Sequence, residues 1–177
     1  MQSKKFILII YGASCAGKST ITEELMKVVP EMFHIRKDKI KWFISQYESM
    51  MHNDMLHNMA YDLGKRAVKD GLSLIMEGTP KVESGLWKNY KKLADENGMA
   101  FYEVNMEADL EVLKKRFQER VDNMHTSGRK LANKSMEHFL FLHDLYLKSK
   151  HEGIPTFYSD KQSVEEITGE ILKIIGN

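Results

Sequence analysis

Apolar and polar positions follow two different periods along the chain, and these periods predict its secondary structure. Short apolar runs, typical of buried strands, lie near 5–11, 32–37, 72–77, 100–106 and 154–158. Segments with helical periodicity lie between and after them, at 18–29, 39–69, 83–97, 108–122, 134–150 and from 164 onward. Because strands and helices alternate, we expect an α/β fold whose mostly parallel, five-stranded sheet is covered by helices on both faces.

Composition and charge restrict the functions that are open to the chain. It has 177 residues, 42% of them apolar, and its 26 Lys and Arg against 25 Asp and Glu give a formal net charge of +1. So small a charge creates no field that attracts nucleic acid, and no apolar run approaches the roughly 20 residues of a membrane span. The single cysteine forms no internal disulfide, which fits a reducing compartment. We therefore expect one cytoplasmic domain over 1–177, monomeric or homodimeric, with neither a nucleic-acid nor a membrane partner.

A glycine-rich segment joins the first predicted strand to the first predicted helix. It has the pattern G-x-x-x-x-G-K-[ST], and its candidate cofactor-binding residues are Gly12, Ala13, Ser14, Cys15, Ala16, Gly17, Lys18, Ser19 and Thr20. Four residues between the glycines let the backbone curl around a phosphate with its N–H groups pointing inward, and the helix start adds partial positive charge. The segment is therefore predicted to be a phosphate-binding loop, or P-loop.

Three side chains of this loop have chemistry of their own. Lys18 can reach the β and γ phosphates of a nucleotide, and Ser19 offers a hydroxyl to Mg²⁺, which prefers oxygen ligands. Cys15 has no histidine near it in sequence, so we interpret it as a small loop residue with an exposed thiol that can be oxidised or alkylated. We expect ATP and Mg²⁺ as cofactors, Lys18 as a catalytic residue and Ser19 as a metal ligand.

With its motifs in this order, the chain resembles the P-loop kinases that include adenylate kinase, shikimate and gluconate kinases, chloramphenicol phosphotransferase and the zeta-type kinases. The resemblance covers essentially the whole length, although only the P-loop is highly specific. It implies a three-layer P-loop NTPase fold with strand order 2-3-1-4-5, an acceptor-binding helical segment at about 39–70 and a small lid at about 121–134. It also implies transfer of the γ-phosphoryl group of ATP to a small-molecule acceptor.

Two charged residues follow the second predicted strand. In the kinases that the chain resembles, an Asp in the place of Asp38 accepts the proton of a substrate hydroxyl or helps to hold Mg²⁺. The alternative is that Asp38 only caps the helix that begins at Lys39. Lys41 stands where nucleotide kinases carry an Arg that holds the acceptor's phosphate, and a lysine cannot grip phosphate with two donors. Lys41 is therefore either a substrate-binding residue or a solvated surface lysine.

The third predicted strand ends in an acidic residue that is followed by Gly and Pro. The segment Glu77-Gly78-Thr79-Pro80-Lys81 is similar to the D-G-x-P-R segment of adenylate kinase, with Glu for Asp and Lys for Arg. The resemblance implies that Glu77 helps to hold Mg²⁺ through its waters and that Lys81 contacts the acceptor. Alternatively, Glu77 pairs with a lysine such as Lys81.

Arginines mark the helix predicted at 108–122 and the polar segment that follows it. Arg116 and Arg120 lie one turn apart, beside the apolar seam of this helix, so both can point toward a cleft. Adenylate kinases show a similar R-x₃-R, lid, S-G-R order, which gives Arg129 a place in the lid. We expect all three to bind the cofactor, and Arg116 and Arg120 to act in catalysis, since planar cations suit developing phosphoryl charge. The alternative is an ordinary solvated, charged helix.

A row of apolar residues recurs every four positions in the segment predicted to be helical at 39–69. We interpret this row as the core stripe of a helix, or alternatively as the lining of an apolar acceptor site; its members are Met51, Met55, Met59 and Leu63.

Three functions are compatible with these motifs. The first is a kinase for the hydroxyl of a small molecule, with Asp38 as base. The second is a nucleoside monophosphate kinase in which Lys41 and Lys81 contact the acceptor's phosphate. The third is a nucleotide-binding regulatory or repair partner that hydrolyses ATP slowly.

Overall fold

The structure is a computed structural model that describes residues 4–78, 86–123, 135–150 and 152–176. Strands and helices alternate along the chain as the sequence predicts. The elements are β1 (Phe6–Gly12), α1 (Lys18–Val28), β2 (Met32–Ile35), α2 (Lys37–Ile40), η1 (Lys41–Phe43), α3 (Ser49–Lys69), β3 (Ser73–Gly78), α4 (Leu86–Glu96), β4 (Ala100–Glu107), α5 (Leu110–Asp122), α7 (Met136–Ser149), β5 (Thr156–Tyr158) and α8 (Val164–Ile175).

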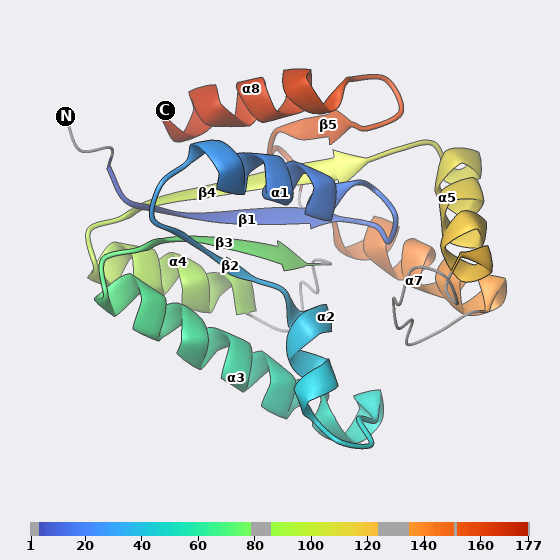
Figure 1. The fold of residues 1–177 in the computed structure, drawn as a ribbon, viewed down its shortest axis with the longest axis horizontal. Helices are drawn as coiled ribbons and strands as arrows, with labels where there is room; N and C mark the ends of the chain where they lie inside the picture. Colours follow the sequence, from blue (N-terminus) through green and yellow to red (C-terminus); the bar gives the residue numbers. More distant parts are fainter. Residues whose placement is uncertain (1–3, 79–85, 124–134, 151, 177) are drawn as a thin grey trace.

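The strands form one five-stranded sheet in the order β2-β3-β1-β4-β5, and every pair of neighbours is parallel. The predicted architecture and strand order are therefore confirmed. Figure 1 shows α1 and α8 on one face of the sheet and α3 and α4 on the other. Since all strands run the same way, the segments that leave their carboxyl ends gather at one edge of the sheet.

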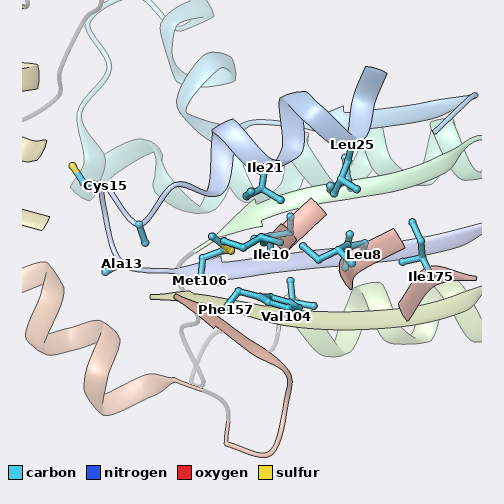
Figure 2. Close-up of a cluster of buried hydrophobic side chains, with 14 of the residues drawn as sticks. Leu8, Ile10, Ala13, Cys15, Ile21, Leu25, Val104, Met106, Phe157 and Ile175 are labelled. Carbon is cyan, nitrogen blue, oxygen red and sulfur yellow. The ribbon is translucent and has the colours of Figure 1, made fainter. Parts of the chain in front are cut away.

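Strand β1 is buried along its whole length because it is covered on both faces. Phe6, Leu8 and Ile10 point into the core beneath α1 and α8, where Figure 2 shows Leu8 and Ile10 close to Ile21 and Leu25 of α1. The alternate residues of β1 pack with α3 and α4 in a second core. The period-2 pleat thus divides one continuous apolar run between two layers of helices.

The carboxyl end of β1 passes very close to β4. Gly12 pairs with Met106 and has a φ of +152°, and a Cβ built on it would lie 2.3 Å from the Met106 carbonyl oxygen. Only a residue without a side chain fits at this distance. The first glycine of the P-loop motif is therefore required by strand packing, in addition to any need of the loop itself.

The predicted core stripe of α3 is wrong, because its members lie on the surface. Met51 is 72% exposed and Met55 is 44% exposed, and Met59 and Leu63 are similarly exposed. The helix instead turns small residues toward the sheet: Ala60 is fully buried, and a Cβ on Gly64 would lie 3.1 Å from the Ile35 side chain. Helix α3 packs too close to the sheet for a methionine row to fit beneath it.

Helical structure in the predicted segment 39–69 is interrupted between η1 and α3. Gln46, in this gap, has a φ of 51°, a left-handed conformation that does not continue a right-handed helix. None of the helices in the described residues is long and apolar enough to cross a membrane.

Replacing Gly12 by alanine should destabilise the fold far more than the same change at Gly71. Gly71 also has a left-handed φ, +82°, but nothing lies within 4 Å of its added Cβ, so Gly71→Ala should cost about 1–2 kcal/mol. Gly12→Ala adds a clash with backbone and should cost about 3 kcal/mol or more. Urea unfolding of both variants measures the difference, and equal losses would show that β4 yields to the extra methyl group.

Candidate functional site

The glycine-rich loop leaves β1 at Gly12 and enters α1 at Lys18. Within it the Ala16 amide donates to the Ala13 carbonyl at 3.3 Å, which closes a tight turn. Cys15 has a φ of 68° and Gly17 a φ of 89°, so two residues of this short loop are left-handed. Alternation of right- and left-handed residues is the backbone geometry that turns successive N–H groups into an anion-binding nest.

Helix α1, like α2 and α3, begins without the side-chain cap that α5, α7 and α8 have. Asp109 caps α5, Ser135 caps α7, and Ser163 caps α8 as part of a capping box with Glu166. Gly17 occupies the N-cap of α1, where no described side chain accepts from the first amides, and the first turn has no acidic residue. These amides lie next to the loop nest, so an anion there would meet both.

Lys18 folds back over the loop. Its Nζ donates to the Gly12 carbonyl at 2.8 Å and to the Ala13 carbonyl at 2.7 Å. Burial lowers the pKa of Lys18 to about 8, and the charge of Arg120 lowers it further, while the charges of Glu77 and Asp38 oppose the shift. Because all of these groups affect the same ammonium, the structure brings four sequence-predicted site residues together at the P-loop.

Ser19 and Glu77 meet where β3 ends. The Ser19 hydroxyl donates to Glu77 Oε2 at 2.6 Å and accepts from Arg36 Nη2 at 3.0 Å. On the other side of the carboxylate, His34 Nε2 lies 2.8 Å from Glu77 Oε1. Burial would raise the pKa of Glu77, but the hydrogen bonds from His34 and Ser19 outweigh it and hold the pKa below its usual value. The acid is therefore ionised at neutral pH.

This pair of residues fits Mg²⁺. A hydroxyl and a carboxylate are hard oxygen donors, and Mg²⁺ is usually held by one or two protein oxygens together with phosphate oxygens and water. The described residues contain no group of three or more His, Cys, Asp or Glu side chains that could hold a metal by themselves. Arg36 occupies one of the two lone pairs of the Ser19 hydroxyl, and the other is left for a cation. Arg36 and His34 are partners of the site that the sequence analysis missed.

Asp38 lies in the first turn of α2 rather than at its start. Arg36 is the N-cap of α2, and it makes no side-chain cap, so the interpretation of Asp38 as a helix cap is wrong. The helix begins two residues earlier than predicted, which turns Asp38 outward. Its side chain is 84% exposed.

Lys41 is the partner of Asp38. Its Nζ donates to Asp38 Oδ1 at 2.5 Å, and only 11% of its side chain is exposed, so it is not a solvated surface lysine. Enclosure by the chain would raise the pKa of Asp38. The hydrogen bond from Lys41, with the charges of Lys41 and Lys18, outweighs that effect and lowers the pKa. An exposed carboxylate is thus kept ionised within electrostatic reach of the P-loop lysine.

Further residues around Asp38 were not found from the sequence. Tyr47, between η1 and α3, has a raised pKa because of burial and the charge of Asp38. Lys37 Nζ lies 2.9 Å from His57 Nε2 of α3. Helical or strand periodicity cannot pair these residues, because the non-helical segment between η1 and α3 interrupts the pattern.

The two arginines of α5 differ in their surroundings. Arg116 Nη1 donates to the Cys15 carbonyl at 3.3 Å and to Ser159 Oγ at 2.8 Å, while Nη2 donates to the Ser159 carbonyl at 2.9 Å. Arg120 is exposed, and its charge acts on Lys18. The interpretation of this stretch as an ordinary solvated helix face therefore fails for Arg116. Ser159, which follows β5, accepts two of the three hydrogen bonds that hold Arg116.

Three predictions about single residues have different outcomes. Cys15 is only 5% exposed and belongs to the same cluster of buried residues as Ala13 and Ala16, so its predicted exposure is wrong. Lys81 and Arg129, like most of the expected lid, lie outside the described residues. Their roles stay predictions.

Comparison with known proteins identifies the type of fold. Residues 7–139 match the profile of the family described as AAA domain. A candidate kinase from Chloroflexus aurantiacus has 16% identity and a TM-score of 0.70 over 97% of this chain and 98% of that one. The tunicamycin resistance protein of Deinococcus radiodurans has 13% identity and a TM-score of 0.63 over 98% and 96%.

The APS kinase of Mycobacterium tuberculosis, solved with AMPPNP and APS, has 14% identity and a TM-score of 0.64 over 98% of this chain and 99% of that one. The search of curated proteins found no match. At these identities the structural likeness shows a shared fold, the one that the sequence analysis expected for P-loop kinases.

Nucleotide binding should take up a proton at alkaline pH. With a pKa of about 8, Lys18 is mostly neutral at pH 9 when the site is free, and a bound triphosphate stabilises its charged form. Binding of ATP at pH 9 should therefore consume close to one proton, and at pH 6.5 almost none should enter at Lys18. Calorimetry in buffers of different ionisation enthalpy measures this uptake. Lys18→Met should bind more weakly and abolish the uptake at pH 9, and uptake that persists in this variant would assign the proton to another group.

Proposed function

This chain belongs to the AAA domain family, and on that premise we propose that it is an ATP-dependent phosphotransferase that moves the γ-phosphoryl group to a hydroxyl of a small molecule. One observation supports a hydroxyl group as the acceptor. Asp38 presents an exposed, ionised carboxylate whose charge reaches Lys18, and Lys41 fixes it from the buried side. A carboxylate beside the transferred phosphoryl group is the group that a hydroxyl nucleophile requires.

Binding of the nucleotide would use the uncapped start of α1. Amides of the loop and of the first helical turn would donate to the phosphates, and Lys18 would leave the carbonyls of Gly12 and Ala13 for the β and γ phosphates. Ser19 and Glu77 would hold Mg²⁺, whose charge neutralises phosphate oxygens. Arg120, exposed and acting electrostatically on Lys18, would meet negative charge that develops on the transferred group.

Asp38 would orient the acceptor more than it would remove its proton early. Its lowered pKa makes it a weak base, although it stays a good hydrogen-bond acceptor for a hydroxyl. In the loose transition state of phosphoryl transfer, most bond breaking precedes proton loss, so a weak base suffices. The bond from Lys41 restricts the carboxylate to one orientation, which favours a positioned nucleophile.

The structure gives less support to a nucleoside monophosphate acceptor. That reading needs a cation to hold the acceptor's phosphate, and Lys41 is mostly buried with its ammonium already bound to Asp38. Using Lys41 for a phosphate would leave Asp38 unpaired and close to a second negative group. No described contact singles out the third reading, slow hydrolysis by a regulatory protein.

A screen of small hydroxyl compounds with γ-labelled ATP tests the proposal directly. At least one acceptor should receive the label in the presence of Mg²⁺, and Lys18→Ala should lose the transfer because nothing then neutralises the β and γ phosphates. The fold should survive this change, since the hydrogen bonds of the ammonium within the described residues go to loop carbonyls. Transfer that continues undiminished in Lys18→Ala would exclude the P-loop as the site. Transfer to nucleoside monophosphates alone would support the second reading.

The variant Asp38→Asn distinguishes a kinase for hydroxyl acceptors from a nucleoside monophosphate kinase. The amide keeps the size of the side chain but loses the charge that Lys41 holds in one orientation and that takes up the proton late in transfer, so with a hydroxyl acceptor kcat should fall by roughly 10²–10⁴. ATP affinity should change little. Asp62→Asn, which removes a carboxylate from a surface pair on α3, is the matched control and should keep full activity. A near-normal kcat in Asp38→Asn with a hydroxyl acceptor would remove Asp38 from the mechanism.

A further inference from the structure

We infer that Arg116 is a positioning residue, which holds the P-loop in its phosphate-binding shape by joining the Cys15 peptide to Ser159. This differs from direct contact with the phosphates, the role expected from the sequence. The inference rests on the proposed nucleotide site, but it does not depend on which acceptor is phosphorylated, or on transfer occurring at all.

The contacts of Arg116 join two segments that are far apart in sequence. Two of its three hydrogen bonds grip Ser159, one at the hydroxyl and one at the carbonyl, and the third reaches the carbonyl of Cys15. Both terminal nitrogens are thus engaged by atoms of the protein itself. A planar guanidinium can make this two-pronged contact, whereas the ammonium of a lysine cannot.

Cys15 is the residue of the loop that needs such a restraint. Its φ of 68° is left-handed, a conformation that is unfavourable for a residue with a side chain. Strained residues of this kind persist only where surrounding contacts hold them in place. Rotation of the peptide that follows Cys15 would break the bond to Arg116 and disturb the neighbouring amides of the nest. Arg116 therefore opposes the motion that would spoil the anion site.

Ser159 is a suitable anchor because it is itself fixed. Its amide donates to the Glu107 carbonyl at 2.9 Å and its hydroxyl to the same oxygen at 3.3 Å, so it is attached to the end of β4. It also lies near the other left-handed residue of the loop, since a Cβ built on Gly17 would lie 3.4 Å from the Ser159 Cβ. The P-loop, the end of β4 and the segment after β5 therefore form one connected unit.

Arg120 provides the internal comparison. It lies one turn further along α5, is exposed, and influences the charge of Lys18, whereas Arg116 is tied to protein atoms. The two arginines would thus have different roles, Arg116 in the shape of the loop and Arg120 in the transfer step. Loss of Arg116 should weaken nucleotide binding by loosening the loop, and loss of Arg120 should slow the transfer step.

The single cysteine of the chain reports on the loop without any need for turnover. Cys15 is 5% exposed, so its reaction with iodoacetamide requires local opening of the loop. In Arg116→Ala the alkylation rate should rise about tenfold and the Kd for ATP should rise by a similar factor, because hydrogen bonds to a charged group are lost. Lys115→Ala, which removes the adjacent exposed cation of α5, should leave both values at those of the parent protein.

Two further variants protect the test against simple misfolding. Arg116→Lys keeps the charge but not the fork, so it should show most of the effect of Arg116→Ala. Ser159→Ala removes one of the three contacts and should give a smaller effect. Combining Ser159→Ala with Arg116→Ala should add little, since both changes break the same connection. Circular dichroism and thermal melting identify any variant that has lost its fold. The folded variants then test the positioning role of Arg116.

The inference is overturned if folded Arg116→Ala and Arg116→Lys alkylate at the parent rate. It is also overturned if either variant lowers kcat while ATP affinity stays unchanged, because Arg116 would then act on the transition state. Arg120→Ala should show that second pattern, with slow alkylation and reduced kcat. Failure to find any acceptor would count against the phosphotransferase proposal and leave the alkylation and affinity results valid.

Discussion

A partly desolvated cation among backbone carbonyls is the interaction on which the rest of the site depends. Lys18 can occupy that place because β1 delivers the loop at the carboxyl edge of a sheet that is covered on both faces, so little water reaches the ammonium. Its burial is unfavourable, and the carboxylates of Glu77 and Asp38 offset part of the cost. An incoming polyphosphate would offset much more. The free site is therefore charged in advance for an anionic ligand.

The neighbouring strands supply those carboxylates at fixed places. Glu77 stands at the end of β3, next to β1 in the sheet, and Asp38 follows β2, which is the next strand outward. Each acid has its own partners: Glu77 lies beside His34 and the guanidinium of Arg36, and Asp38 is bound by the ammonium of Lys41. Moving outward from the cation Lys18, one meets first the acids Glu77 and Asp38 and then the cations Arg36 and Lys41. The outer cations keep both acids ionised, and the acids in turn favour the charged form of Lys18. This order of charges follows from the strand order and from the side of each strand at which the chain leaves.

Features that depend on residues adjacent in sequence could be predicted from the sequence. Features that depend on contacts between distant segments could not. The P-loop was readable because strand, loop and helix are contiguous, and the sheet followed from the alternation of elements together with the family resemblance. The methionine row of α3 was misassigned because periodicity shows that a face is apolar without showing how close the helix packs to the sheet. His34 was missed because its partner, Glu77, lies on another element.

The contact between Gly12 and Met106 bears on how such sequences diverge. A side chain at Gly12 would collide with the backbone of β4, whether or not a nucleotide ever enters the loop. A homologue with a different function would thus remain under selection to retain this glycine, while the same packing places no such demand on Asp38 and Arg120, whose side chains are exposed. In distant homologues the first glycine of the motif is accordingly a marker of inherited architecture, and retention of the exposed charged residues is the better sign of a shared function.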